Sequence, residues 1–315
     1  MTTVDSSLFL DIADALGISS PAIVEKDYWA TQFLKEISKL TPKGYQLVFS
    51  GGSCLAKAHQ NTFRMSEDID IQMIPHPETA ALTNNQQRQL RREIHQLILN
   101  IIEDSDQFKL ASAPQKRNEG KYQQFLIEYP REHDTPDALR PHLQLDLTES
   151  NLLEDPVELS LSSLYASTLK EKSEIEKITC VTINSTASEK FVSLLRRTAS
   201  HGRDNSRADD KTLIRHVYDL HLIFSTMTSP QTLKSMVQQV IDIDKKQFGR
   251  QHKEFVDNPN LELHYGLSLL IEQPQHQERY KKFIGPLVYH PSPAQWSEAI
   301  SSIKSLADYW LTIDI

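Results

Sequence analysis

Cysteine is almost absent from this chain, which has only Cys54 and Cys180 in 315 residues. Two cysteines this far apart in sequence indicate neither a disulfide framework nor a cysteine metal site. Long apolar runs are absent as well, so the sequence predicts no membrane-spanning helix. The N-terminus has acids and no basic region ahead of its apolar residues, unlike a secretory signal peptide. We therefore expect a cytoplasmic protein that makes no membrane contact.

Positive charge is in deficit, with 34 Lys and Arg against 42 Asp and Glu and a formal net charge of −8. A protein that coats DNA or RNA is usually basic, so this balance argues against general nucleic-acid binding. Residues 190–215 are an exception, because they contain seven basic and three acidic residues. Two interpretations stay open for this segment: a contact for a triphosphate or an RNA backbone, or a solvated helix face and loop.

Glycine is also scarce, at nine residues, but two of the nine are adjacent. Gly51 and Gly52 follow the apolar stretch 47–49, which predicts a buried strand ending in a tight turn. Ser53 can then cap a short helix from Cys54 to about Gln60. Free amides at a helix start, beside backbone that carries no Cβ, favour the binding of a phosphate.

Two acids follow the turn, Asp68 and Asp70, at the start of a predicted strand that runs to Met73. The two-residue period of a strand places both carboxylates on one face, roughly 6.5–7 Å apart. Such a pair is repulsive unless a cation lies between the acids, and hard oxygen ligands suit Mg²⁺ or Mn²⁺ together with nucleotide phosphates. The turn and the acid pair therefore predict a site for phosphoryl or nucleotidyl transfer.

A third acid comes from a later predicted strand, His142 to Thr148, in which leucines alternate with polar residues. Asp146 lies on the polar face of this strand. We predict that it is the third metal ligand and that it also helps to deprotonate an acceptor hydroxyl. Glu149, just past the strand, is the alternative.

Elsewhere in the sequence, the spacing of apolar residues predicts both helices and strands in the first half of the chain and helices in the second half. Helices are predicted over 6–16, 21–39, 84–104, 187–198, 209–225, 230–246 and 293–311, and further strands over 122–129 and 178–183. We predict an α+β protein with a catalytic domain at 1–183 and a mostly helical domain at 184–315. The substrate cleft is expected between the two.

Several motifs resemble, in content and in order, those of the nucleotidyltransferases of the AbiEii abortive-infection toxin family, which act in type IV toxin–antitoxin systems. The motifs are Gly51-Gly52-Ser53-Cys54-Leu55-Ala56-Lys57, Arg64-Met65-Ser66-Glu67-Asp68-Ile69-Asp70-Ile71, the upstream segment Ile23 to Trp29, Ser188 to Phe191 and Arg215 to Leu220. The resemblance runs from about residue 16 to about residue 225 and implies a nucleotidyltransferase-like mixed sheet flanked by helices.

Pattern and resemblance together give the candidate site. The catalytic candidates are Asp68, Asp70, Asp146, Lys190 and Asp219, of which the first three are also the metal ligands. The candidates for nucleotide binding are Gly51, Gly52, Ser53, Lys57, Arg64, Ser66, Arg196 and Arg215. Lys190 is predicted to clamp a triphosphate as a point charge. Asp219 lies in an apolar helical stretch and needs a basic partner, for which Lys190, Arg196 and Arg215 are the candidates.

The resemblance also implies a reaction, in which a nucleoside monophosphate moves from an NTP to an acceptor hydroxyl. For some members the acceptor is the 3′ end of tRNA, and the partner that the family implies is a cognate antitoxin. Two alternatives stay open. One is a kinase-like transfer of the γ-phosphoryl group to a protein or small molecule, and the other is a non-catalytic, nucleotide-sensing module on the same fold.

Overall fold

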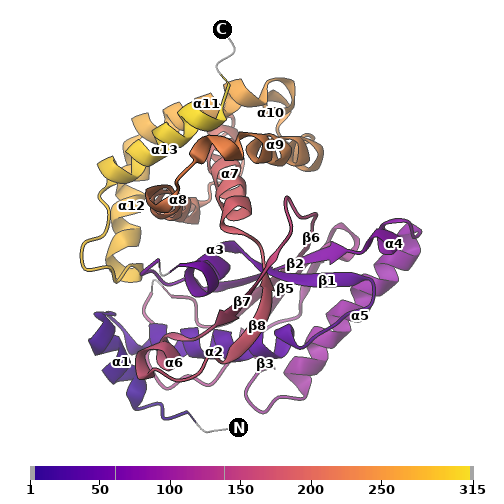
Figure 1. Ribbon diagram of the computed structural model, residues 1–315, viewed down its shortest axis with the longest axis vertical. Helices are drawn as coiled ribbons and strands as arrows, with labels where there is room; N and C mark the ends of the chain where they lie inside the picture. Colours follow the sequence, from indigo (N-terminus) through magenta and orange to yellow (C-terminus); the bar gives the residue numbers. More distant parts are fainter. Residues whose placement is uncertain (1–3, 61, 138, 313–315) are drawn as a thin grey trace. The chain divides into compact units, whose positions relative to one another are not determined.

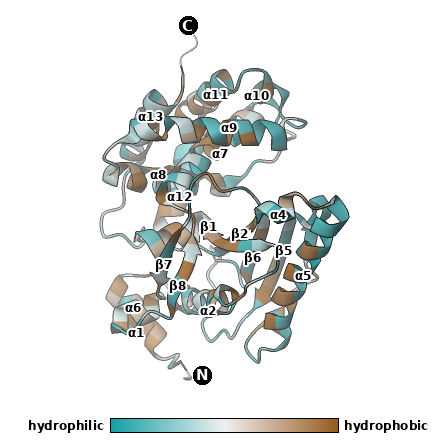
Figure 2. Cartoon of the chain, turned by 45° about the vertical axis from the view of Figure 1, so that its right-hand side comes forward, coloured by the Kyte–Doolittle hydropathy of each residue, from teal (hydrophilic) through white to brown (hydrophobic). Residues whose placement is uncertain are grey.

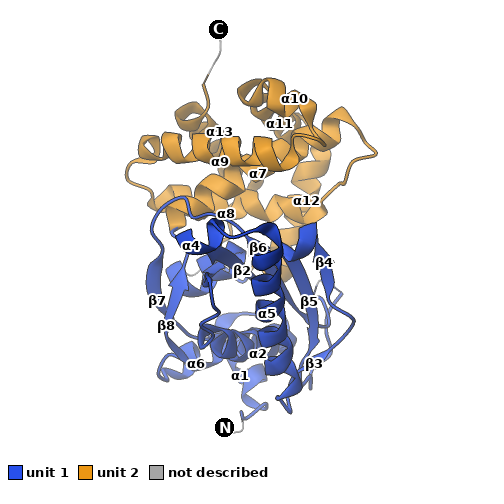
Figure 3. Cartoon of the chain, turned by 90° about the vertical axis from the view of Figure 1, so that its right-hand side faces the viewer, with its two compact units in different colours: residues 1–182, 289–291 blue, residues 183–288, 292–315 orange. Residues whose placement is uncertain are grey.

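The structure is a computed structural model that describes residues 4–60, 62–137 and 139–312. The chain divides into two compact units, which Figure 3 draws in blue and orange. Unit 1 consists of residues 1–182 with 289–291, and unit 2 of residues 183–288 with 292–315. Unit 1 combines a sheet with helices, whereas the described part of unit 2 is helical.

Unit 1 is built on one mixed sheet (Figure 1). Eight strands belong to it in the described part of the chain, in the order β3-β5-β6-β2-β1-β8-β7, with β4 also paired to β5. Their bounds are β1 Tyr45–Ser50, β2 Asp68–Pro75, β3 Lys109–Leu110, β4 Gln115–Arg117, β5 Tyr122–Glu128, β6 Leu143–Glu149, β7 Val157–Leu161 and β8 Ile175–Cys180. The central strand β2 is antiparallel to β1 and parallel to β6.

Helices α2 (Pro21–Ser38) and α5 (Asn84–Glu103) bury their apolar sides in the core of unit 1, against one face of the sheet. The buried residues that they contribute are Ala30, Phe33, Leu34 and Ile37 from α2, and Ile94, Ile98 and Ile102 from α5. In strands β2 and β6 every second residue faces this core, so that hydrophobic and hydrophilic positions alternate along them (Figure 2). This alternation leaves Asp68 and Asp70 of β2, and Gln144 and Asp146 of β6, on the opposite face.

Side-chain caps fix where these two helices begin. Ser20 accepts a hydrogen bond from the amide of Ala22, as the Ser-Pro start predicts. Thr83 and Gln86 form a reciprocal capping box at the start of α5. The other helical segments of unit 1 are α1 Leu8–Leu16, α3 Gly51–Cys54, η1 Leu55–His59, α4 Pro77–Ala80, η2 Asn118–Gly120 and α6 Leu164–Leu169.

Unit 2 is organised around α7 (Ile183–Arg203), which contacts α8, α9 and α11. Its other segments are η3 Lys211–Ile214, α8 Arg215–Thr226, η4 Pro230–Leu233, α9 Lys234–Phe248, α10 Lys253–Asp257, α11 Pro259–Glu272, α12 Pro274–Leu287 and α13 Trp296–Trp310. Helix α11 approaches α7 closely at Gly266, where an added Cβ would lie 2.1 Å from the carbonyl oxygen of Leu195. Among the described helices, none is long and apolar enough to cross a membrane.

The predicted mixed fold is confirmed, but some elements differ from the prediction. Strand β8 covers Ile175–Cys180 instead of 178–183. Its first residues include exposed polar side chains, which give no apolar signal, and residue 183 already belongs to α7. Strand β7 was not predicted, since it is mostly exposed and its apolar residues follow no buried alternation. The roles assigned to residues 1–183 and 184–315 remain predictions.

We expect Gly266→Ala to lower the stability of unit 2 by about 1–3 kcal/mol, because the added methyl group overpacks the contact between α11 and α7. Urea denaturation followed by circular dichroism measures the loss. Ser268→Ala, two residues further along α11, adds no volume and should stay within about 0.5 kcal/mol of the wild type. Equal stability of Gly266→Ala and the wild type would show that the helices are not in close contact.

Candidate active site

The chain turns sharply where β1 ends, and Gly51 makes the turn possible. Its φ of +74° is left-handed, a conformation that residues with a Cβ rarely adopt. An added Cβ at Gly51 would lie 2.0 Å from Oδ2 of Asp70. The Asp70 carboxylate therefore lies directly against the backbone of the turn, and this contact requires glycine at position 51.

The second glycine brings two more candidates to the turn. A Cβ at Gly52 would lie 2.7 Å from Nη2 of Arg64 and 3.0 Å from Oγ of Ser66. Arg64 is buried, and its Nη1 donates to the carbonyl of Met65 at 2.9 Å. The two adjacent glycines thus allow three predicted site residues, from 64 to 70, to pack against the same turn.

Ser53 lies inside the first helical turn and does not cap it, which corrects the prediction. Helix α3 begins at Gly51, with Ser50 in the N-cap position and no side-chain cap bond. The left-handed glycine lets the helix begin earlier than the predicted start at Cys54. The buried hydroxyl of Ser53 instead donates to the backbone carbonyl of Asp68, which ties the turn to the first residue of β2.

The three predicted carboxylates lie on one face of the sheet. Asp70 of β2 and Asp146 of β6 are Cα partners in the parallel pair. Because neighbouring strands lie about 4.8 Å apart, the two side chains are neighbours. Asp68 is two residues before Asp70 and shares its face.

Neutral donors orient the carboxylate of Asp146. Its Oδ1 accepts hydrogen bonds from the hydroxyl of Tyr122 and from Nε2 of Gln124, both at 3.0 Å. Its Oδ2 accepts one from Nε2 of Gln144 at 2.8 Å. These bonds hold the acid in one orientation without a positive charge.

A cation, in contrast, compensates Asp68. Nη2 of Arg140 donates to Oδ1 of Asp68, and Nε of Arg140 reaches Oε2 of Glu67 at 3.4 Å. Burial raises the pKa of Asp68 and Asp146 raises it further, against the effect of Arg140. Glu67 is buried and also accepts a bond of 2.9 Å from the ammonium of Lys26. Burial alone would raise the pKa of Glu67, but Lys26 and Arg140 bring it below its usual value.

Glu149, the alternative third acid, lies on the opposite face of the sheet. It accepts a hydrogen bond of 2.7 Å from the hydroxyl of Tyr45 and pairs with Arg91 of α5 at 2.8 Å. Lys121 adds a third contact at 3.0 Å. The register therefore places Asp146, and not Glu149, beside Asp70.

A cavity of about 430 Å³ opens in unit 1 beside the turn. Lys57, Arg64 and Ser66, three of the predicted nucleotide-binding residues, line it. Its size is that of a small-molecule pocket. Lys57 is 9% exposed, and its ammonium pairs with the carboxylate of Asp27. Lys57 thus reaches the cavity with its charge already balanced.

The donor set fits a hard divalent cation. Carboxylate oxygens are the ligands that Mg²⁺ prefers, and Asp70 and Asp146 supply them from adjacent strands. Within the described ranges, no three His, Cys, Asp or Glu side chains converge, as they stand, closely enough to hold a metal ion. The carboxylate of Asp68 bonds to Arg140.

In unit 2 the structure joins two of the predicted catalytic residues. Nζ of Lys190 lies 2.9 Å from Oδ2 of Asp219, which is fully buried. The expected basic partner of Asp219 is thus confirmed as Lys190. Arg196 pairs with Asp244 at 2.7 Å, and Arg215 begins α8 with a half-buried side chain.

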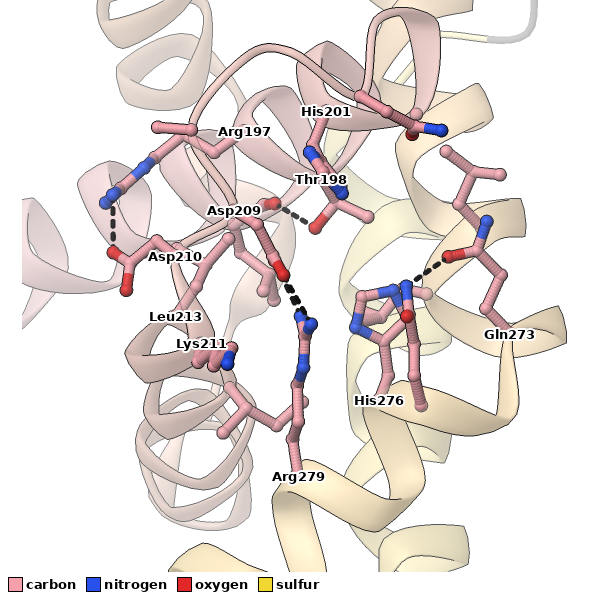
Figure 4. A pocket seen from close by; sticks show the side chains of 18 of the residues that line it. Arg197, Thr198, His201, Asp209, Asp210, Lys211, Leu213, Gln273, His276 and Arg279 are labelled. Atoms are coloured by element: carbon pink, nitrogen blue, oxygen red, sulfur yellow. Dashed lines mark hydrogen bonds and ion pairs between the residues drawn. The ribbon is translucent and has the colours of Figure 1, made fainter.

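Unit 2 has a cavity of its own, of about 450 Å³, in which Arg197, Asp209, Asp210 and Arg279 take part (Figure 4). Arg279 holds Asp209 through two bonds of 2.8 and 2.6 Å, and Arg197 pairs with Asp210. Cations of the basic segment form such pairs too, among them Lys190, Arg196, Arg197, Arg203 and Arg207. This pairing favours a structural interpretation of the segment over a contact with RNA.

A mixed sheet that carries a glycine turn and acids on neighbouring strands defines a nucleotidyltransferase class of fold. The family model of the nucleotidyl transferase AbiEii toxins, of type IV toxin–antitoxin systems, matches residues 32–302. The match spans most of the chain, which therefore belongs to this family of nucleotidyltransferase toxins. The resemblance seen in the motifs is thereby confirmed.

Among solved structures, the chain is similar to MenT4, a nucleotidyltransferase toxin from Mycobacterium tuberculosis H37Rv. The TM-score is 0.58 at 15% sequence identity, and the match covers 98% of this chain and 89% of that one. At this identity the likeness shows the fold alone. None of the curated proteins compared with the chain matches it.

Four residues that contact the acids were not predicted, Tyr122, Gln124, Gln144 and Arg140. The first three alternate along β5 and β6 in register with Asp146, so the strand period could have placed them on its face. No signal in the sequence marks Arg140, which lies 72 residues from Asp68.

We expect Gly51→Ala to disturb the site as well as the fold. A left-handed residue with a Cβ costs about 1–2 kcal/mol, and the methyl group would also displace the carboxylate of Asp70. Gly17→Ala is the matched control, since Gly17 has a φ of +66° and nothing within 4 Å of an added Cβ. Both variants should lose stability on thermal unfolding, and only Gly51→Ala should lose nucleotidyl transfer. A fully active Gly51→Ala enzyme would contradict this reading of the turn.

A histidine in the unit 2 cavity predicts a pH dependence. Burial lowers the pKa of His276 from 6.5 to about 4, with a further contribution from Arg279. Between these values the unfolded chain binds a proton that the folded chain does not, so stability falls as the pH drops from 6.5 towards 4. His276→Gln should remove about 1–3 kcal/mol of this dependence in denaturation curves measured across that window. An unchanged pH slope in His276→Gln would refute the assignment.

Proposed function

We propose that this chain transfers a nucleoside monophosphate from an NTP to a hydroxyl group of an RNA, at the 3′ end of a tRNA, and that the reaction arrests growth. The proposal extends the membership of the chain in a family of nucleotidyltransferase toxins. The observation that carries it is the pairing of Asp70 with Asp146 beside a turn that has no room for a side chain.

A bound Mg²⁺ or Mn²⁺ ion would offset the negative charge on the α-phosphate and on the leaving pyrophosphate. We assign its binding to Asp70 and Asp146, with Asp68 as the third ligand once it exchanges its bond to Arg140. The acceptor hydroxyl attacks the α-phosphorus and pyrophosphate departs. Asp146, oriented by Tyr122, is the residue we propose to accept the hydroxyl proton.

The nucleotide-binding role falls to the turn and the cavity beside it. We propose that the backbone amides of Gly51, Gly52 and Ser53, at the start of α3, bind phosphate oxygens. We propose that Arg64 and Lys57, which line the cavity, contact the nucleotide, with the ammonium of Lys57 positioned by Asp27. In unit 2 we propose Lys190 as a triphosphate clamp that Asp219 holds in place through their ion pair.

Arg196 and Arg215 complete the proposed nucleotide-binding set, and Arg196 does so only indirectly because it is held by Asp244.

As a member of a toxin family of type IV systems, the chain is expected to have a cognate antitoxin as its partner. The acceptor and the antitoxin are the parts of the proposal that experiments must identify.

We expect Asp70→Asn to reduce transfer at least about a hundredfold, because the variant keeps the shape of the side chain and loses the charge that binds the ion. The measurement incubates purified protein with α-labelled NTPs and total cellular RNA and follows label in a discrete RNA population. Wild-type expression should arrest growth, and expression of the variant should not. Equal arrest by both proteins would count against an enzymatic toxin.

Glu149→Gln is the matched control, since Glu149 is an acid of the neighbouring strand β6 that faces away from the site. It should keep transfer per folded molecule. Chelation of divalent ions should stop the wild-type reaction, and added Mg²⁺ or Mn²⁺ should restore it. Label that moves only from γ-labelled NTP would establish the kinase-like alternative, and no transfer of either label would favour the nucleotide-sensing module.

A further inference from the structure

Four exposed cations meet at one edge of unit 1. Arg88 and Arg92 are one turn apart on α5 and lie on the same side of that helix. Lys116 and Arg117 come from the edge strand β4. All four line a cavity of about 410 Å³, which we call the basic groove.

The charge of the basic groove is uncompensated. Within the described ranges, none of the four side chains forms an ion pair, and Glu119 is the single acidic residue of the lining. Arg91, between the two exposed arginines, is instead buried and pairs with Glu149. Burial lowers the pKa of Lys116 and the nearby guanidinium of Arg92 lowers it further, as expected for like charges without a counter-ion.

This concentration of charge is unusual for a chain with a net charge of −8. In unit 2 most basic residues of the segment 190–215 are paired with carboxylates, so the segment offers little uncompensated charge to an RNA backbone. Keeping four like charges together without counter-ions costs stability, which favours a binding role for the basic groove.

One of the four cations, Arg117, links the basic groove to the acids around the edge of the sheet. Arg117 and Tyr122 are Cα partners on β4 and β5, and the guanidinium carbon lies 5.6 Å from the centre of the Tyr122 ring. The hydroxyl of the same tyrosine donates to Asp146 at 3.0 Å. One aromatic side chain therefore separates Arg117 from the carboxylate proposed to act on the acceptor, whereas Arg88, Arg92 and Lys116 lie on the α5 side of the sheet.

We propose that the basic groove binds the phosphate backbone of the acceptor RNA, so that the end of the strand reaches Asp146. The identity of this partner rests on the proposed function. Arginine forks match phosphate oxygens, and cations from a helix and a strand can follow successive phosphates of one strand. The contact is with backbone, so it positions the acceptor and does not read its sequence.

The test measures binding separately from catalysis. A fluorescein-labelled RNA hairpin with a single-stranded 3′ tail is titrated with full-length protein carrying Asp70→Asn, and anisotropy is recorded at several KCl concentrations. Adding Arg88→Glu and Arg92→Glu should weaken binding about tenfold or more at low salt and reduce the slope of log K against log[KCl] by about 2. Lys116→Gln with Arg117→Gln should act in the same direction, with a smaller effect.

Lys172→Glu with Lys177→Glu is the matched control. It makes the same change in net charge at the β7–β8 end of the sheet, where Lys177 pairs with the exposed Glu158. RNA affinity should change less than twofold. Circular dichroism and thermal unfolding of all variants exclude loss of folding as a cause.

Two results would overturn the proposal. If Arg88→Glu/Arg92→Glu leaves RNA affinity and the salt slope unchanged, the basic groove does not bind RNA. An acidic protein segment would then be its expected ligand. An equal loss of affinity in the control would show that net charge, and not this surface, governs binding. The binding assay needs no turnover, so its result can be interpreted even if the protein shows no nucleotidyl transfer. If transfer is intact and RNA binding is unchanged in the groove variants, the RNA-binding role of the basic groove is rejected and the proposed function stands.

Discussion

The site depends on one electrostatic constraint: three carboxylates share a single face of one sheet, on two neighbouring strands. Like charges this close must be separated, hydrogen-bonded or neutralised. The protein treats each acid differently. Asp70 lies against a glycine backbone, Asp146 is held by neutral donors, and Asp68 is bound by Arg140. A divalent ion would relieve the same repulsion, which is why the arrangement is suited to binding one.

The fold holds these acids in place because alternate residues of each strand face the apolar core and the opposite side of the sheet. Along β6, Leu143, Leu145 and Leu147 are fully buried in the core of unit 1, and Asp146 points to the other face. A shift of one residue in register would exchange the two sets, so the apolar core that fixes the register also fixes the acids. Glu149 follows the same rule. It is three residues after Asp146, so its side chain lies on the opposite face of the sheet, where it pairs with Arg91 of α5.

Net charge is a poor guide to where this protein would meet a polyanion. The most basic segment of the sequence, residues 190–215, is largely neutralised inside unit 2 by carboxylates that come from elsewhere in the chain, among them Asp244 and Glu262. The basic groove of unit 1 is built from two pairs of cations that lie 24 or more residues apart in the sequence, and its charge is not compensated. An acidic protein can in this way present a local positive surface close to an acidic site, which is what an enzyme acting on RNA needs.

The sequence alone determined the elements with strong local signals. The paired glycines marked the turn, the two-residue period placed Asp68, Asp70 and Asp146 on one face, and buried Asp219 predicted a basic partner. Only the tertiary structure decided which cation met which acid. Arg140 reaches Asp68 across 72 residues, and Arg92 meets Lys116 because β4 pairs to β5 beside α5. Periodicity reports which face a side chain takes, but strand order brings distant segments together, and no local pattern encodes that order.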